Sequence, residues 1–148
     1  MKIPPAYQVP SPFGATVGGV NPLFFSMKPE AQYDSWLTVG KTTGDSKSEL
    51  SIIGIDAKKW TAQAGLNVIN GAVFWMNPQK GPTGSVVLAQ LTVPTTYSGT
   101  AVVNMQGKDK GMLGKTGDGA NWDQRGTVCR RRPSFRDLQI THMSPLVL

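Results

Sequence analysis

The sequence is organised around residues 72–106, AVFWMNPQKGPTGSVVLAQLTVPTTYSGTAVVNMQ. The first part, residues 72–76, is a short apolar run rich in aromatic and β-branched side chains, which predicts a strand. Residues 77–84 then supply two prolines and two glycines, which end regular structure. Residues 85–93 and 100–106 alternate apolar and polar positions, as strands with one buried face do. Because a short glycine-containing link joins these two segments, we expect them to form an antiparallel pair.

The residues before this stretch predict further short strands separated by turns. The predicted strands are residues 23–27, 34–40, 50–55 and 66–69. Residues 56–65 are expected to contain a single helical turn capped by Asp56, with Trp60 tucked under the sheet. Asn70 and Gly71, a pair favoured in type I′ turns, lead into the central stretch. Short strands at this spacing, without a long helix, predict an all-β fold, namely an antiparallel β-sandwich of about 6–8 strands.

The chain of 148 residues is long enough for one domain with one core. Residues 1–22 are rich in proline and glycine, which predicts an extended N-terminal arm, either loose or lying along a neighbouring surface. Residues 23–126 are expected to form the β-sandwich domain. From residue 127 onward arginine becomes frequent and glycine disappears. We therefore expect residues 127–148 to be a basic, poorly ordered tail or a segment foreign to the fold.

The positive charge is concentrated near the C-terminus. The formal net charge is +6, and every arginine lies at or after Arg125. Residues 1–124 carry 10 lysines and 8 acidic residues, which leaves a balance of +2. A protein that binds nucleic acid normally carries its basic face on the fold itself, so no nucleic-acid partner is expected.

The sequence carries no visible membrane or targeting segment. No apolar run approaches the roughly 20 residues of a membrane-spanning helix, so no membrane insertion is expected. Residues 1–5 lack the apolar core that follows the charged start of a secretory signal, and they do not resemble a transit peptide. We therefore expect a cytosolic chain, or a mature or partial form of a longer one.

The sequence offers no recognisable catalytic, cofactor-binding or metal-binding set, and we predict that the protein is not an enzyme and needs no cofactor. The single cysteine, Cys129, excludes an internal disulfide framework and a cysteine-based zinc site. The single histidine, His142, leaves the body without a base for a catalytic serine or cysteine. The acidic residues of the body are scattered singly: Glu30, Asp34, Asp45, Glu49, Asp56, Asp109, Asp118 and Asp123.

Two segments resemble ligand-binding loops without matching them. Residues 107–116, GKDKGMLGKT, lack the glycine spacing of a P-loop and precede no long helix. Residues 118–123, DGANWD, lack the ligand positions of an EF-hand, so an Asx-rich turn is the simpler interpretation. We expect the glycine-rich residues 107–119 to form a long, mobile hairpin loop.

Four sequence blocks occur in a characteristic order: PEAQYDSWLTVG (29–40), SIIGIDAKKWTAQAGL (51–66), the block 71–108 with GAVFW, VLAQLTVP and QGK, and NWDQRG (121–126). Their order and spacing resemble the shared region of the pyrenoid shell (PyShell) proteins of marine algae. The resemblance covers most of the chain, from residue 18 to residue 126. The family pattern has two related halves and continues as a strand after NWDQRG, whereas this sequence has one copy followed by CRRRPSF.

The resemblance implies a structural, self-assembling protein. Pyrenoid shell proteins form a protein sheet that encloses the Rubisco-containing pyrenoid of the chloroplast and supports carbon concentration. The implied partners are further copies of this chain, together with shell paralogues or the Rubisco matrix, and the implied location is the chloroplast pyrenoid. In such a lattice, strand edges and the arm at residues 1–22 would contact neighbouring copies.

A looser similarity exists to β-rich extracellular proteins of marine bacteria, which carry DSFVTIG-like and AQLTV-like strands. This similarity implies a secreted or surface β-sandwich module that binds carbohydrate or protein. Aromatic side chains commonly line such binding surfaces. The candidate surface aromatics are Trp60, Trp75 and Trp122.

Overall fold

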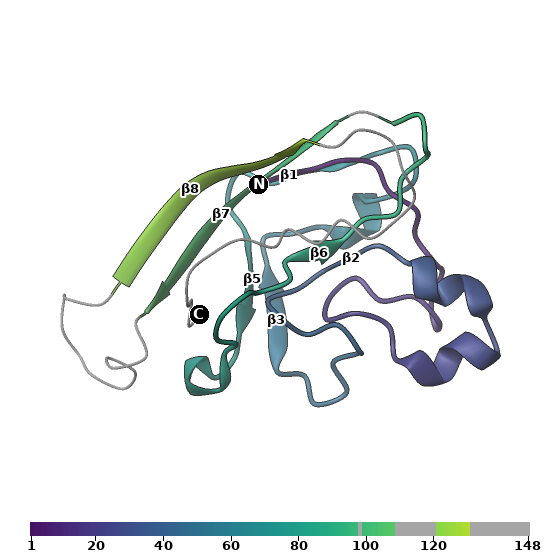
Figure 1. Ribbon diagram of the computed structural model, residues 1–148, viewed down its shortest axis with the longest axis horizontal. Coiled ribbons are helices and arrows are strands. Elements are labelled where there is room, and N and C mark those ends of the chain that lie inside the picture. The colour runs from purple at the N-terminus through teal and green to yellow at the C-terminus, as the bar shows by residue number, and fades with distance from the viewer. Residues whose placement is uncertain (98, 109–120, 131–148) are drawn as a thin grey trace.

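The computed structural model describes residues 1–97, 99–108 and 121–130 (Figure 1). Within these residues the named strands pair antiparallel in three sheets. The helical elements of the same residues are 3₁₀ turns of three to five residues. The prediction of an all-β fold is therefore confirmed.

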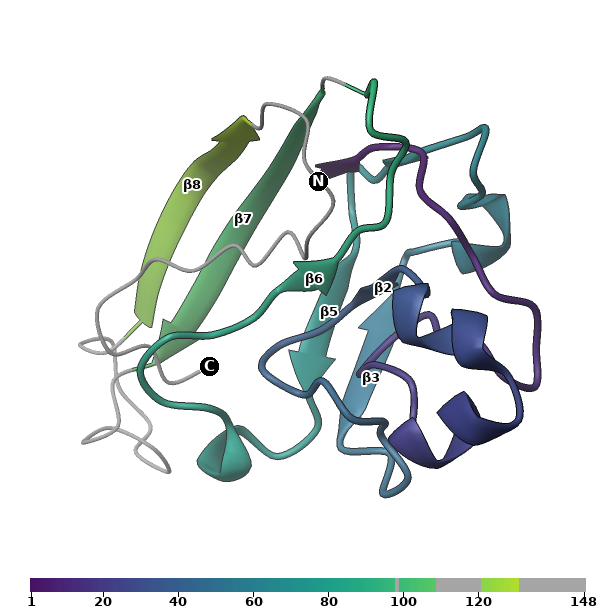
Figure 2. The same ribbon diagram turned by 45° about the vertical axis from the view of Figure 1, so that its right-hand side comes forward.

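The largest sheet has four strands in the order β4-β1-β7-β8. Its members are β1 (Lys2–Ile3), β4 (Leu66–Asn67), β7 (Thr100–Lys108) and β8 (Asn121–Arg130). The long pair of β7 and β8 lies at one end of the molecule, and the 3₁₀ turns of residues 22–33 lie at the other (Figure 2). Along β7 the buried Ala101 and Val103 alternate with more exposed residues, which confirms the alternation predicted there.

The two smaller sheets have two strands each. Strand β2 (Trp36–Leu37) pairs with β6 (Ala89–Gln90), and β3 (Leu50–Ile53) pairs with β5 (Ala72–Trp75). The main core joins residues of the four-stranded sheet to residues of β2 and β6: Ile3, Leu66, Ala101, Val103, Leu37 and Ala89. The second core consists of Val9, Val20, Ala31 and Trp36. Because Leu37 belongs to the main core and its neighbour Trp36 to the second, β2 is buried on both faces.

Residues 1–22 are part of the body and do not stand away from it as an arm. Strand β1 lies between β4 and β7, and the N-terminal ammonium of Met1 donates a hydrogen bond to the carbonyl oxygen of Val68 at 2.7 Å. Ile3 and Val9 are buried in the two cores. The expectation of an arm that is loose or reaches a neighbour is therefore wrong, because the apolar side chains between its prolines fill the cores of their own chain.

The predicted strand at residues 23–27 is instead a 3₁₀ turn, η1 (Pro22–Ser26), which is followed by η2 (Pro29–Tyr33). The side chain of Asn21 accepts a hydrogen bond from the N–H of Leu23 at 3.0 Å and so caps η1. Each turn begins with a proline, whose fixed φ suits the start of a helical turn and whose missing N–H weakens a strand.

Residues 85–93 pair with β2 and its continuation, not with β7. Beyond the two regular residues of β6, the N–H groups of Thr38 and Gly40 donate to the carbonyl oxygens of Leu88 and Val87, each at 2.8 Å. The antiparallel pair predicted between this segment and β7 is therefore wrong. Alternation shows which face of a strand is buried, but it does not show which strand lies alongside.

The two turns predicted around β4 have different outcomes. Neither Asn70 nor Gly71 has the positive φ of a type I′ turn, and the flanking strands β4 and β5 belong to different sheets. That prediction is wrong. The predicted helical turn is present as η3 (Ala57–Lys59), although Asp56 makes no side-chain capping bond and lies 3.3 Å from Nζ of Lys59 instead. A further 3₁₀ turn, η4 (Pro78–Lys80), follows β5.

Strand β8 runs through Arg130, so the tail boundary predicted at residue 127 falls inside a strand. The pairing of β7 with β8 extends from Thr100 opposite Arg130 to Lys108 opposite Asn121, with a β-bulge between. Residues 127–130 remain in the sheet because β7 lies beside them as a hydrogen-bonding partner. Most of the predicted loop at residues 107–119, most of the segment 107–116 and all of residues 131–148, with His142, lie outside the described residues. Of the predicted Asx-rich turn at residues 118–123, the first three residues lie outside the described residues. Residues 121–123 form the start of β8, so the turn prediction is wrong there.

Trp60 fastens the N-terminal segment to the main core. Its side chain is 2% exposed, and its Nε1–H donates to the carbonyl oxygen of Pro4 at 2.9 Å. A buried indole N–H usually finds such a partner. The prediction that Trp60 lies under the sheet is confirmed.

We expect Ile3→Ala to lower the free energy of unfolding by about 2–5 kcal/mol, because it leaves a cavity where β1 enters the main core. Urea denaturation of the purified chain measures this change. The matched control is Lys2→Ala on the exposed side of the same strand, which should stay within about 0.5 kcal/mol of the parent. Equal effects of the two substitutions would show that β1 is not part of the cooperative fold.

Candidate functional site

Asp34 is a carboxylate buried at the end of η2. The residue is 0% exposed. Its Oδ1 accepts a hydrogen bond from the N–H of Val9 at 2.7 Å, and its Oδ2 accepts one from the N–H of Ala15 at 2.6 Å. Burial raises the pKa of Asp34 above its ordinary value, and the backbone N–H donors only partly offset this effect. The carboxylate therefore holds residues 9–15 against the body.

A raised carboxyl pKa is one mark of a catalytic acid, but the surroundings of Asp34 do not suit that role. A catalytic acid must reach the proton that it transfers, directly or through one water. Both oxygens of Asp34 are already engaged by backbone N–H groups, and the residue is closed to solvent. Its role is structural.

The residues beside Asp34 continue this network. Oγ of Ser35 accepts a hydrogen bond from the N–H of Thr92 at 2.9 Å, and Nε2 of Gln90 donates to the carbonyl oxygen of Asp34 at 2.7 Å. The N–H of Ser35 donates to the carbonyl oxygen of Tyr7 at 3.1 Å. These bonds join three segments that are far apart in the sequence.

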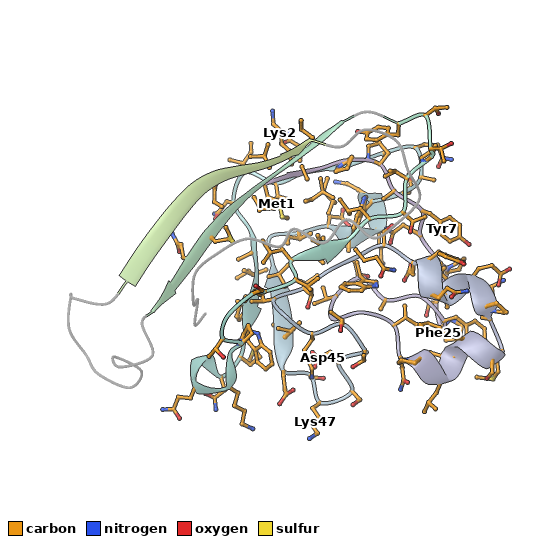
Figure 3. All side chains as sticks on the ribbon, viewed as in Figure 1. Met1, Lys2, Tyr7, Phe25, Asp45 and Lys47 are labelled. Carbon is orange, nitrogen blue, oxygen red and sulfur yellow. The ribbon has the colours of Figure 1, made fainter. Side chains whose placement is uncertain are left out.

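A charged cluster organises the loop of residues 41–49, where Figure 3 labels Asp45 and Lys47. Nζ of Lys41 lies 2.6 Å from Oδ1 of Asp45 and 2.6 Å from Oε2 of Glu49. The same ammonium lies 5.9 Å from the ring centroid of Trp75, within the range of a cation–π contact. The carboxylate of Asp45 also accepts hydrogen bonds from two backbone N–H groups at the start of β3.

The ion pairs shift all three pKa values of this cluster. Burial would lower the pKa of Lys41, but its bonds to the two carboxylates outweigh burial and raise that pKa. Burial would likewise raise the pKa of Asp45, but Lys41 and the backbone donors lower it overall. The hydrogen bond from Lys41 is the main reason that the pKa of Glu49 is lowered. All three groups are therefore held in their charged forms.

The sequence carries one signal for this cluster. Lys41, Asp45 and Glu49 follow one another at intervals of four in the polar stretch of residues 41–49. The fold brings the carboxylates of Asp45 and Glu49 together, and the ammonium of Lys41 forms an ion pair with each of them. Among the described residues no group of three or more His, Cys, Asp or Glu side chains is placed to hold a metal ion.

The candidate surface aromatics are not a binding platform in the described part of the chain. Trp60 is buried. Trp75 is half-buried, and its Nε1–H donates to the carbonyl oxygen of Val39 at 2.7 Å. The side chain of Trp122 lies outside the described residues. For Trp60 the alternative of a surface position is therefore wrong, and for Trp75 the expectation of surface exposure holds only in part.

Six of the eight large apolar side chains that are exposed among the described residues belong to two regions, and the other two are Tyr7 and Ile69. The first is the outer face of β3 and β5, with Ile53, Phe74 and Met76. The second is the region of η1 and η2, with Leu23, Met27 and Tyr33. Isolated apolar residues are ordinary on a protein surface, whereas gathered ones mark contacts with other molecules. The β3–β5 face is the better defined region because its strand register is fixed.

No family model, curated protein or solved structure matches the chain. Within the described residues, no helix has both the length and the apolar character to cross a bilayer. Function must therefore be inferred from the surfaces of the chain and from the resemblance of its sequence blocks.

We expect Asp34→Asn to lower the free energy of unfolding by about 1–3 kcal/mol, because the amide can accept only one of the two backbone hydrogen bonds. Its NH₂ group would face the other N–H, leaving a buried donor without an acceptor. Urea denaturation measures the change. The matched control is Glu30→Gln, the same chemical change at an exposed carboxylate, which should have an effect within about 0.5 kcal/mol. Equal stabilities of the two variants would contradict the structural role of Asp34.

The stabilisation from the Lys41 cluster should depend on pH. Asp45 and Glu49 have folded pKa values below their ordinary values of 3.8 and 4.5. Their contribution is therefore present above the ordinary values and is lost as the pH falls through the lower folded values. We expect the stability difference between the parent and Lys41→Met to shrink on going from about pH 7 to about pH 3.

Urea denaturation at a series of pH values measures this difference. Lys58→Met is the matched control, because Lys58 is exposed, lies outside the cluster and makes no ion pair among the described residues. A difference for Lys41→Met that stays constant with pH would contradict a stabilising role of the ion pairs of Lys41 with Asp45 and Glu49.

Proposed function

We propose that the chain is a structural, self-assembling protein of the pyrenoid shell type. Its copies form a protein sheet around the Rubisco-containing pyrenoid of the chloroplast, and that sheet serves carbon concentration. The order of the blocks 29–40, 51–66, 71–108 and 121–126 supports the choice of this kind of assembly. Further copies of the chain are the main partner, with shell paralogues or the Rubisco matrix beside them.

The observation that carries the proposal is the exposed apolar outer face of β3 and β5. A chain that assembles with its own copies must present contact surface before it assembles. The sheets of this chain are small, and one of them leaves apolar side chains on the side away from the core. Apolar area removed from water contributes about 25 cal/mol per Å² to an association.

We further propose that the three sheets are arranged as a β-sandwich. The main core supports this arrangement, because it draws side chains from the four-stranded sheet and from the β2–β6 pair. Such an arrangement leaves strand edges at its sides. Strand β8 stands at the edge of the four-stranded sheet in the described chain, and an edge of this kind pairs readily with another chain.

The packing of residues 1–22 changes how such an assembly would be built. Those residues fill the cores of their own chain, so contacts between copies must come from sheet faces and strand edges. Two different contacts per copy are enough to extend an open array, provided that the second does not close a ring. The alternative, a secreted carbohydrate- or protein-binding module, has weaker support because Trp60 is buried and the indole of Trp75 is engaged by Val39.

Negative-stain electron microscopy of the purified 148-residue chain tests the proposal. We expect sheets or tubes at micromolar concentration, with their amount rising steeply with concentration. A glycan-binding assay on the same sample serves as the comparison for the alternative. A chain that stays monomeric at high concentration would contradict assembly, and a glycan ligand for that monomer would favour the alternative.

A further inference from the structure

The outer face of β3–β5 has a regular arrangement of large and small side chains. In the pairing register, Ser51 lies opposite Phe74 and Ile53 lies opposite Ala72. Because side chains alternate along a strand, these four share one face, and Leu50, Ile52, Val73 and Trp75 share the other. The second set is buried or half-buried against the body. The first set therefore points outward.

Each cross-strand pair of the outer face joins one large and one small side chain. In the first pair the large side chain is Phe74 of β5, and in the second it is Ile53 of β3. The face thus has two projections on one diagonal and two hollows, at Ser51 and Ala72, on the other. Ile53 is 64% exposed and Phe74 is 37% exposed, so both projections are accessible.

This arrangement is complementary to itself. A second copy can be related to the first by a two-fold axis that runs parallel to the strands and midway between β3 and β5. In that arrangement, β3 of each copy lies over β5 of the other. Its Phe74 then lies over Ser51 of the first copy, and its Ile53 lies over Ala72. The same two contacts occur in the reverse direction, as two-fold symmetry requires. Two sheets packed in this way lie about 10 Å apart with their side chains interlocked.

We propose that the β3–β5 outer face binds the same face of a second copy of this chain, with Ile53 of each copy over Ala72 of the other. The inference deepens the proposed assembly and rests on it, since it supplies one of the contacts of the array. The pair is symmetric and closes on itself. Growth of a sheet then requires a different surface to join one pair to the next.

The β3–β5 face offers only a small contact, because its two strands have four residues each. A stable complex of two proteins buries about 800 Å² on each side. Two strands of this length fall short of that area, so one contact alone is weak. A weak contact becomes effective in an array, where each copy is held by several contacts at once.

Two substitutions and their mixture test the register of the pair. Ile53→Glu places a carboxylate against the apolar hollow at Ala72 of the partner copy, and Ala72→Lys places an ammonium under Ile53. We expect each variant alone to associate about tenfold more weakly than the parent, because a charge is buried without a partner. When the two variants are mixed, the carboxylate introduced in one copy meets the ammonium introduced in the other, and association should recover in that mixture only.

Sedimentation velocity of the full chain over a range of concentrations measures association, and circular dichroism confirms that each variant is folded. The matched control is Ala62→Glu, which also introduces a carboxylate at an exposed apolar residue but lies between η3 and β4, outside both exposed apolar regions. It should associate as the parent does. Failure of the mixture to recover, or equal weakening by Ala62→Glu, would overturn the inference.

Electron microscopy of the same samples separates this inference from the proposed function. If the parent forms pairs that the mixture test supports but no sheets, the pair stands and the shell function fails. If sheets form and Ile53→Glu forms them at the same concentration, the function stands and the pair is overturned. If the parent is a monomer at every concentration, both proposals are overturned.

Discussion

The fold depends on one buried charge, the carboxylate of Asp34, and on the backbone N–H groups that surround it. A carboxylate removed from water costs several kcal/mol unless hydrogen bonds replace its hydration. Here the replacement comes from Val9 and Ala15 of the N-terminal segment. The same short stretch uses Ser35 to accept the N–H of Thr92. The N-terminal segment therefore has to be in place before the charge is satisfied, and Ser35 joins a third part of the chain to the same point.

Such side-chain bonds matter because the regular elements are short. Strands β1, β2, β4 and β6 have two residues each, so their ladders contribute few hydrogen bonds. Bonds from Asp34, Asp45 and the indole of Trp60 supply partners for backbone groups that a longer ladder would otherwise satisfy. The packing of residues 1–22 follows from the same requirement: a segment interrupted by prolines cannot form a long strand, but its apolar residues can still fill the cores.

Short-range patterns in the sequence predicted local features, but they did not predict which distant segments pair in the sheets. The all-β class, the alternation along β7, the helical turn at η3 and the burial of Trp60 all follow from short-range pattern. The partner of residues 85–93 could not be predicted, because alternation identifies the buried face of a strand and not the strand that lies beside it. The Lys41 cluster escaped because a spacing of four has meaning on a helix, whereas here a loop fixed by β3 brings the charges together.

The contrast between the outer faces of two sheets bears on assembly. On β7 the outward positions include Thr100, Asn104 and Gln106, all exposed and polar, which is the usual pattern of a sheet with one face in water. On β3 and β5 the outward positions include Ile53 and Phe74. The two outer sheet faces therefore differ, because the β3–β5 face exposes apolar side chains whereas the outward positions of β7 named above are polar. A small apolar face gives a weak contact, and weak contacts let misplaced copies leave a growing array before further contacts hold them.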